Sequence, residues 1–283
     1  SHEYDVAVLE LDSWQLQGFH TETVSPHIAV FTNFMKDHMN YYKGDMKAYF
    51  YDKSAIFRYQ KETDYFVTET EVIEYAQKYN ATIQAQTIIP EPYTQSIGSL
   101  LGTHNRHNAA LAFEALQAYG MSENEIENHF KHLSPPHGRL EKRATVNNTA
   151  FYNDTNATIP EATISSLKAL QDEGYEQILL ITGGSYKEID VDDYFEYISL
   201  YVSKLFLLDG TGTEKAMINP PLIPYDIYTS LQDAFKAAVS QINTKQKTAL
   251  VLSPAFASFG MFKNEYDRGD QFNELVGEYL SAQ

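Results

Sequence analysis

Short apolar runs alternate with amphipathic stretches along most of this chain, which is the pattern of a fold built from alternating strands and helices. Continuous apolar runs indicate buried strands, and apolar residues spaced three and four apart indicate helices. The runs predict strands over 4–11, 27–32, 65–68, 81–86, 143–147, 149–152, 177–182, 204–208, 226–228 and 248–252. Helices are predicted over 45–59, 69–79, 109–119, 159–170, 192–202, 230–242 and 267–281, with another opening at the capping box Ser122-x-x-Glu125.

The best domain boundary is the segment Ser134-Pro135-Pro136-His137-Gly138-Arg139. Two prolines and a glycine end the preceding helix, and the pattern restarts with a hairpin across Asn147-Asn148. Strands and helices then alternate to the last residue. We therefore expect an α/β protein of two domains, residues 1–138 and 139–283, the second with a mostly parallel sheet covered by helices on both faces.

Composition narrows the class of protein. The 283 residues contain no cysteine, which excludes disulfides and thiol catalysis. Their formal net charge of −17 argues against nucleic acid as a partner, because an acidic surface repels phosphate. No apolar run is long enough for a membrane span, and no signal-peptide pattern opens the chain. We expect a soluble, cytoplasmic protein with no membrane partner.

Several polar residues fall where predicted strands end, which is where open α/β sheets bind ligands. Glu10 ends the first strand, and Asp37-His38 follow the second. Lys53 lies on the mainly apolar face of the predicted helix 45–59. Two of these residues also have an ordinary structural interpretation. Glu10 could be a surface acid, and Lys53 a side chain that extends to water.

Two loops are further candidates for binding. His104, Asn105, His107 and Asn108 stand at a helix start, where capping and ligand binding are both consistent with the residue types. The stretch after the last predicted strand, Ser253 to Phe272, begins with small residues that let a turn approach a ligand. From composition alone it is also an ordinary joint between a strand and a helix.

Taken together and in order, these segments resemble motifs of the Mur ligase family. The matching segments are Glu10-Leu11-x-Ser13-Trp14-Gln15-Leu16, Asn33-Phe34-x-x-Asp37-His38-Met39, Tyr49-x-x-x-Lys53-x-x-Ile56, Gly102-x-His104-Asn105-x-x-Asn108-Ala109, Arg139-Leu140-Glu141 and Asn153-Asp154-Thr155-Asn156-Ala157-Thr158. The final loop, Ser253-Pro254-Ala255-x-Ala257-Ser258-Phe259, resembles that of the family's D-glutamate-adding branch. The resemblance covers essentially the whole chain.

The resemblance implies a central ATP- and metal-binding domain, truncated at its N-terminus, followed by a Rossmann-like domain that binds the amino acid. The implied reaction is ATP-dependent ligation of D-glutamate to UDP-N-acetylmuramoyl-L-alanine through an acyl phosphate, in peptidoglycan synthesis, by a monomer. Mg²⁺ or Mn²⁺ would be bound by Glu10, His38 and Lys53. His38 and Lys53 would serve catalysis, with Lys53 carbamylated so that it carries a carboxylate instead of a cation.

The resemblance also implies binding roles for two further groups of residues. ATP would be contacted by Asn105, Arg139 and Asp154. The implied substrate-binding residues are Asp12, Ser13 and Gln15 for the UDP-muramoyl substrate, and Thr158, Lys187, Ser258 and Phe259 for D-glutamate.

The chain departs from the family pattern at four positions. Asn156 stands where the family has lysine, Glu265 where an aromatic residue is common, and Asp12 where serine is usual; Gly138 is inserted before Arg139. The phosphate-loop motif G-x-x-x-x-G-K-[ST] is absent, so we expect this motif upstream of Ser1 and no turnover by the chain as given. The alternatives are a folylpolyglutamate-type ligase and a degenerate nucleotide-binding or regulatory protein.

Overall fold

The computed structural model describes residues 6–187 and 190–282, and its contacts divide the chain into two compact units. Unit 1 comprises Ser1–Ile97 and Asn105–Lys131, and unit 2 comprises Gly98–His104 and His132–Gln283. The domain boundary after residue 138, predicted from the segment with two prolines and a glycine, stays a prediction, as do the roles that the family resemblance assigns to the two domains. No described helix combines the length and the apolar character that crossing a bilayer requires.

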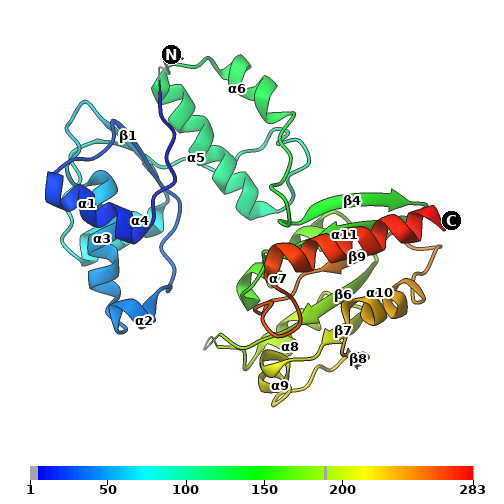
Figure 1. Ribbon diagram of the computed structural model, residues 1–283. Coiled ribbons are helices and arrows are strands. Elements are labelled where there is room, and N and C mark those ends of the chain that lie inside the picture. The colour runs from blue at the N-terminus through cyan, green and yellow to red at the C-terminus, as the bar shows by residue number, and fades with distance from the viewer. Residues whose placement is uncertain (1–5, 188–189, 283) are drawn as a thin grey trace. The chain divides into compact units, whose positions relative to one another are not determined.

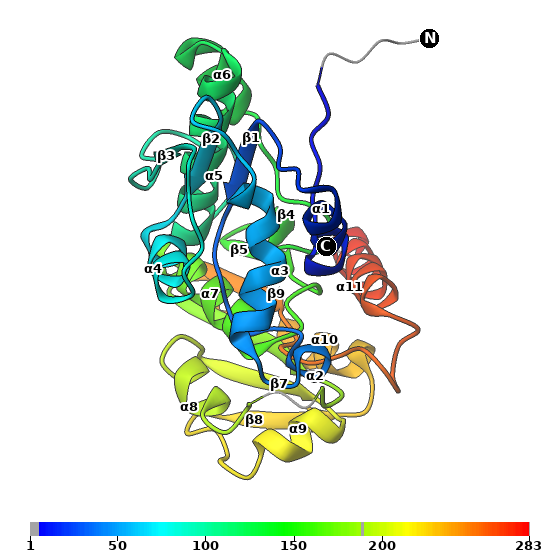
Figure 2. The ribbon, with the colours of Figure 1, turned by 90° about the vertical axis from the view of Figure 1, so that its left-hand side faces the viewer.

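Unit 1 is built on a parallel sheet of order β1-β2-β3. Its elements are α1 (Ser13–Glu22), β1 (Ile28–Phe31), α2 (Met39–Tyr42), α3 (Met46–Arg58), β2 (Tyr65–Thr68), α4 (Thr70–Lys78), β3 (Gln86–Ile88), α6 (Glu123–Phe130) and most of α5 (Thr103–Tyr119). Helix α3 packs against α1 and β1 (Figure 2). It buries Phe50 and Phe57 completely, and the Phe57 and Phe66 ring centroids lie 4.5 Å apart.

Three expectations for unit 1 are wrong. Residues 6–11 form no strand, and Val8 is 93% exposed, because none of the described strands supplies the hydrogen bonds that an apolar run needs to become one. The third strand begins at Gln86 instead of residue 81, and α5 begins six residues earlier than expected, at Thr103 instead of residue 109. Helix α1 was not expected, although its capping box Asp12-x-x-Gln15 is readable in the sequence.

Unit 2 contains a sheet of order β4-β5-β9-β6-β7-β8, antiparallel only between β4 and β5. Its elements are β4 (Glu141–Val146), β5 (Thr149–Asn153), α7 (Pro160–Asp172), β6 (Gln177–Gly183), α8 (Tyr194–Ile198), β7 (Lys204–Leu208), α9 (Thr211–Ala216), β8 (Tyr225–Tyr228), α10 (Leu231–Val239), β9 (Thr248–Leu252) and α11 (Glu265–Ser281). The predicted hairpin and mostly parallel α/β sheet are confirmed. Helix α8 is shorter than the predicted range 192–202, and α9 was not expected.

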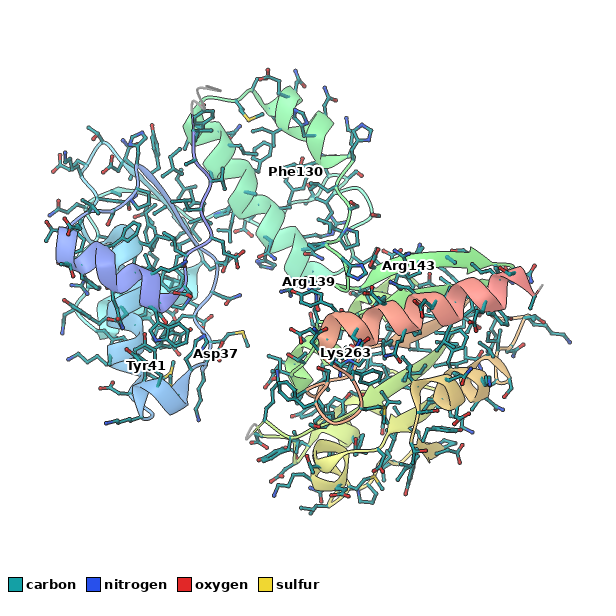
Figure 3. The ribbon with its side chains drawn as sticks, in the orientation of Figure 1. Asp37, Tyr41, Phe130, Arg139, Arg143 and Lys263 are labelled. Carbon is teal, nitrogen blue, oxygen red and sulfur yellow. The ribbon has the colours of Figure 1, made fainter. Side chains whose placement is uncertain are left out.

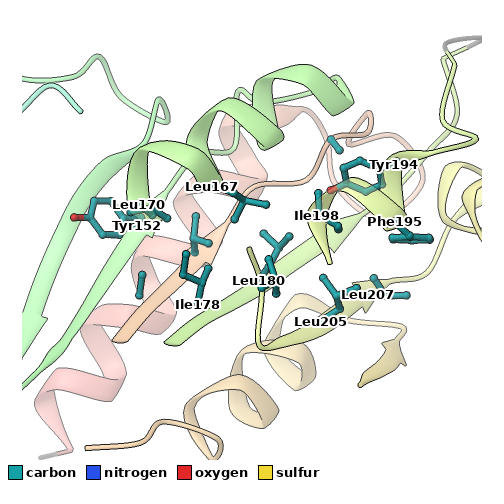
Figure 4. Close-up of a cluster of buried hydrophobic side chains, with 14 of the residues drawn as sticks. Tyr152, Leu167, Leu170, Ile178, Leu180, Tyr194, Phe195, Ile198, Leu205 and Leu207 are labelled. Carbon is teal, nitrogen blue, oxygen red and sulfur yellow. The ribbon is translucent and has the colours of Figure 1, made fainter. Parts of the chain in front are cut away.

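Helices cover both faces of this sheet. On one face, Leu167 and Leu170 of α7 and Phe195 of α8 pack on the strands in a buried cluster (Figure 4). On the other face lie α10 and α11 (Figure 1), whose Phe235 and Phe272 belong to a second buried cluster. Each large apolar side chain buried in this way stabilises the fold by about 1.5–3 kcal/mol. Burial on both faces explains why β5, β6 and β9 read as continuous apolar runs.

The connections that follow neighbouring strands of this sheet run to opposite faces. Strand β9 returns between β5 and β6. The chain leaves β5 and β6 for helices α7 and α8 on one face, but leaves β9 for α11 on the opposite face. Turns that diverge to opposite faces leave a crevice at the carboxyl ends of neighbouring parallel strands, the usual place for a ligand in open α/β sheets.

Candidate functional site

A cavity of about 370 Å³ in unit 1 is lined by Glu10, Leu11, Asp12, Gln15 and Lys53. Asp12 and Gln15 form the capping box of α1, in which the Gln15 N–H donates to Asp12 Oδ1 and the Asp12 N–H donates to Gln15 Oε1, both at 2.8 Å. The cavity thus brings together two of the three predicted metal ligands, Glu10 and Lys53. It also contains two of the three predicted UDP-substrate contacts, Asp12 and Gln15. The third such contact, Ser13, is buried beneath it, 1% exposed.

Lys53 reaches this cavity from α3 across aromatic rings. Its Nζ lies 5.5 Å from the centroid of Tyr49 and 5.6 Å from that of Phe31, distances at which the ring faces stabilise a cation. Burial lowers the pKa of Lys53, and the negative charges of Asp37 and Asp12 partly oppose that shift. A lowered pKa increases the fraction of neutral amine, the form that reacts with electrophiles.

His38 lies near the cavity and is not one of its lining residues. It has φ +54° at the start of α2, and its ring packs edge-on against Trp14, with centroids 4.9 Å apart, and near Tyr49 at 6.0 Å. Its Nε2 is 3.4 Å from Asp37 Oδ2. Tyr49 is therefore shared between His38 and Lys53, so the three predicted metal ligands belong to one neighbourhood while His38 faces aromatic side chains.

The donors present fit a divalent cation only in part. Within residues 6–187 and 190–282, no three histidine, cysteine, aspartate or glutamate side chains are arranged to hold a metal ion. The cavity does present the carboxylates of Glu10 and Asp12, and oxygen donors of this kind are what Mg²⁺ prefers. A carboxylate on Lys53 would supply a third, so the fit depends on the chemical state of that lysine.

Three turns of unit 2 are joined at the carboxyl edge of the sheet. The turn after β9 is tied to the turn after β5 by the Ala255 N–H donating to Ala157 O at 2.8 Å. It is tied to the turn after β6 by a two-hydrogen-bond bridge between Ser185 and Ala257, at 2.9 and 3.1 Å. These joints lie within two residues of the predicted D-glutamate contacts: Thr158, Lys187, Ser258 and Phe259.

The four predicted D-glutamate contacts differ in exposure. Ser258 is 4% exposed, whereas the Phe259 side chain is 63% exposed, and the Ser185 hydroxyl donates to the Phe259 carbonyl. Lys187 is exposed and Thr158 is half-buried. A buried hydroxyl, an exposed cation and an exposed ring, carried on joined turns, form a set suited to a small anionic ligand. Their assignment to D-glutamate stays a prediction.

Asp154, the predicted ATP contact after β5, is buried at the same edge of the sheet, 4% exposed. Its Oδ2 accepts from the Ser253 hydroxyl at 2.6 Å and its Oδ1 from the Leu140 N–H at 2.8 Å. Burial raises the pKa of Asp154 to about 6, against the opposing effect of these two hydrogen bonds and of the charge of Arg139. Asp154 therefore joins β5, β9 and the segment that carries Arg139.

The raised pKa of Asp154 gives a prediction for stability against pH. A group whose pKa is higher in the folded protein adds stability below its unfolded pKa and loses that stability as pH rises through the folded value. Relative to Asp154→Asn, the free energy of unfolding of the wild type should fall by about 2.5 kcal/mol between about pH 4 and about pH 7. Urea unfolding at each pH measures it. If the difference in unfolding free energy between the wild type and Asp154→Asn does not change with pH, the burial argument is contradicted. The same holds if the exposed control Asp172→Asn shows an equal change with pH.

Two departures from the family pattern, Gly138 and Asn156, are in contact with each other. The Asn156 backbone N–H donates to Gly138 O, and its Nδ2 donates to His137 O, both at 2.9 Å. Gly138 has φ +72°, and a Cβ there would lie 2.7 Å from Thr155 Cγ2. Where the family has a lysine, this chain therefore has an amide that fixes the segment before Arg139, and the inserted glycine makes that contact sterically feasible.

The predicted ATP contacts are divided between the units. Asn105 belongs to unit 1, whereas Arg139 and Asp154 belong to unit 2, so a joint contact with ATP stays a prediction. Arg139 is exposed at the start of the β4–β5 hairpin, and Lys263 lies on the turn before α11 (Figure 3). Within unit 2, His104 Nδ1 lies 3.0 Å from Ser165 Oγ.

Sequence reasoning missed three residues that connect turns at the carboxyl edge of the unit 2 sheet: Thr155, Ser253 and Arg268, each fully buried. Thr155 and Ser253 stand within the matched motifs and Arg268 in the stretch from Ser253 to Phe272, but nothing in their spacing distinguishes a buried hydrogen-bonding residue from a ligand contact. The signal that could have found Arg268 is an arginine in the predicted helix 267–281, one turn before the apolar residue Phe272.

The sequence is similar to a family model and to named bacterial ligases. Residues 1–89 match the family model of the Mur ligase middle domain. The chain is 33% identical to the UDP-N-acetylmuramoylalanine--D-glutamate ligase of Borreliella burgdorferi, over 95% of this chain and 63% of that protein. It is 30% identical to the enzyme of the same name from Prochlorococcus marinus, over 98% of this chain and 63% of that protein. The chain thus spans a little under two thirds of the length of these relatives.

Solved structures share the fold at lower sequence identity. The MurF ligase of Thermotoga maritima, in complex with ADP, superposes with a TM-score of 0.67 at 13% identity, covering 96% of this chain and 66% of that one. The folylpolyglutamate synthase of Mycobacterium tuberculosis, complexed with ADP and AMPPCP, gives a TM-score of 0.63 at 16% identity, covering 90% and 65%. At such identities the likeness concerns the fold alone.

Proposed function

Because the chain belongs to the Mur ligase family, we propose that it carries out the metal- and amino-acid-binding parts of an ATP-dependent ligase that adds D-glutamate to UDP-N-acetylmuramoyl-L-alanine. The observation that carries this proposal is the joining of the turns that bear Thr158, Lys187 and Ser258 at one sheet edge. Relatives at 30% identity or more named for D-glutamate ligation support the choice of amino acid.

In this proposal the unit 1 cavity holds the cation and phosphate groups of the reaction. Glu10 and Lys53 would hold Mg²⁺ or Mn²⁺ with help from His38, and the cation would neutralise phosphate charge during transfer to the substrate carboxylate. Asp12, Ser13 and Gln15 would contact the UDP-muramoyl substrate close by. Since an ammonium group would repel the cation, Lys53 acts as a carbamate, and its depressed pKa favours the neutral amine that combines with CO₂.

Unit 2 would bind the amino acid in this proposal and would contribute two of the three ATP contacts. Arg139, with a permanent charge and a forked set of donors, suits a phosphate; Asp154 of unit 2 and Asn105 of unit 1 would complete the ATP contacts. Lys187 and the hydroxyls of Thr158 and Ser258 would hold the carboxylates of D-glutamate, with Phe259 beside them. The amine of D-glutamate then attacks the acyl phosphate of the muramoyl substrate, forming the amide and releasing phosphate. The protein would act as a cytoplasmic monomer.

The test is amide formation by the full-length protein. With ATP, Mg²⁺ and UDP-N-acetylmuramoyl-L-alanine, we expect phosphate release and a product of the corresponding mass with D-glutamate, and at least about a hundredfold less with L-lysine or L-alanine. Equal rates with all amino acids would overturn the choice of amino acid. Turnover with a folate and L-glutamate instead would favour a folylpolyglutamate-type ligase, and ATP binding without turnover would favour a regulatory protein.

A further inference from the structure

Arg268, in the first turns of α11, is a completely buried arginine, at 0% exposed. Its guanidinium makes three hydrogen bonds: Nε donates to Thr155 Oγ1 at 3.1 Å, Nη2 to Thr155 O at 2.9 Å, and Nη1 to Phe256 O at 3.1 Å. All three acceptors are neutral oxygens. The Phe262 ring lies on the same group, with its centroid 5.9 Å from Cζ.

No carboxylate among the described residues forms an ion pair with Arg268, although the chain as a whole carries a net charge of −17. Burial lowers the pKa of Arg268 to about 10, with only the more distant charge of Glu265 acting against that shift. The group therefore stays charged at neutral pH, and a buried unpaired charge is costly to a fold.

The hydrogen-bond acceptors of Arg268 lie on two different turns at the carboxyl edge of the sheet. Thr155 lies in the turn after β5 and Phe256 in the turn after β9, so one side chain joins two turns that lead to opposite faces of the sheet. Thr158 and Ser258 follow these two acceptor residues by three and two positions. Helix α11 is held close to the first turn, because the Thr155 hydroxyl donates to Glu265 O at 2.8 Å and a Cβ on Gly269 would lie 2.6 Å from Thr155 Cγ2.

We propose that Arg268 is a positioning residue for the acidic amino acid: it fixes the spacing of the Thr158 and Ser258 turns and supplies a buried positive charge that a bound dicarboxylate balances. This inference rests on the proposed function and deepens it. In the low-dielectric interior a charge acts over a longer distance than in water, so contact with the ligand is not required. The arrangement also provides local positive charge within an acidic protein, where an anionic ligand would otherwise be repelled.

A purely structural role makes a different prediction. A residue that only holds the turns together would, when replaced, lower stability and impair ATP and amino-acid use alike. A positioning residue whose charge matters should instead raise KM for D-glutamate selectively, and a lysine at the same position, which retains charge but cannot make the same three bonds, should retain part of the function.

The experiment compares Arg268→Lys and Arg268→Gln in the full-length protein, with exposed Lys236→Gln on α10 as the control that removes one positive charge elsewhere. We expect Arg268→Gln to raise KM for D-glutamate by about tenfold or more, with KM for ATP changed by less than about twofold and a smaller rise for Arg268→Lys. Thermal unfolding of each variant reports folding.

Equal KM rises for ATP and D-glutamate, or Lys and Gln variants that behave alike, would overturn the role of the charge. If the Gln variant does not fold, the Lys variant decides: an unchanged KM for D-glutamate, or a rise matched by that for ATP, rejects the proposal. Absence of D-glutamate turnover in the wild type would instead reject the proposed function. Wild-type turnover with no selective effect of Arg268 rejects this inference alone.

Discussion

Replacing Lys53 by alanine is expected to lower kcat for D-glutamate ligation by about a thousandfold, while KM for D-glutamate changes little. Lys53 shares its cavity with Glu10 and Asp12, so in the proposed function its loss would remove a group from the place where phosphate charge is neutralised. D-glutamate is proposed to bind on turns of unit 2, whereas Lys53 belongs to unit 1. Steady-state kinetics of the full-length protein measures both effects.

The sign of the charge at position 53 can be tested with two further variants. If Lys53 acts as a carbamate, Lys53→Arg should be as inactive as Lys53→Ala because it keeps a cation, whereas Lys53→Glu should retain more activity because it carries a carboxylate. Lys47→Ala, on the exposed face of the same helix, is the matched control and should be close to wild type. Full activity of Lys53→Arg would contradict the carbamate.

Unit 2 was more predictable from sequence than unit 1, for a physical reason. Strands β5, β6, β7 and β9 are covered on both faces, so each appears as an unbroken apolar run that periodicity recognises. Residues 6–11 show the opposite case, since their apolar run resembles a strand but none of the described strands pairs with them. Pairing is a long-range property that a local pattern does not contain.

The candidate site was predictable as a set of residues and not as a set of contacts. The family resemblance selected Glu10, Lys53, Thr158 and Ser258, and the structure places the first pair in one cavity and the second pair on joined turns. Side-chain hydrogen bonds between those turns involve Thr155, Ser253 and Arg268, which are not adjacent in sequence. Only the strand order β5-β9-β6 brings them together.

Gly184 is the position where a single methyl group should disturb this arrangement most. It has φ +142°, and a Cβ there would lie 2.4 Å from the carbonyl oxygen of Ala257, the residue that bridges the turns after β6 and β9. Gly184→Ala should cost about 3 kcal/mol of stability, from backbone strain and overpacking together. It should also raise KM for D-glutamate, because Lys187 and Ser258 stand on the two turns that the methyl group pushes apart.

Gly174→Ala separates the two causes of that loss. Gly174 also has a positive φ, +77°, but a Cβ there meets nothing within 4 Å, so this variant carries the backbone strain alone, at about 1 kcal/mol. Urea unfolding of both variants and of the wild type gives the difference, which is the cost of the contact with Ala257. Equal destabilisation of the two variants, with unchanged KM for D-glutamate, would mean that the spacing of the β6 and β9 turns does not control amino-acid binding.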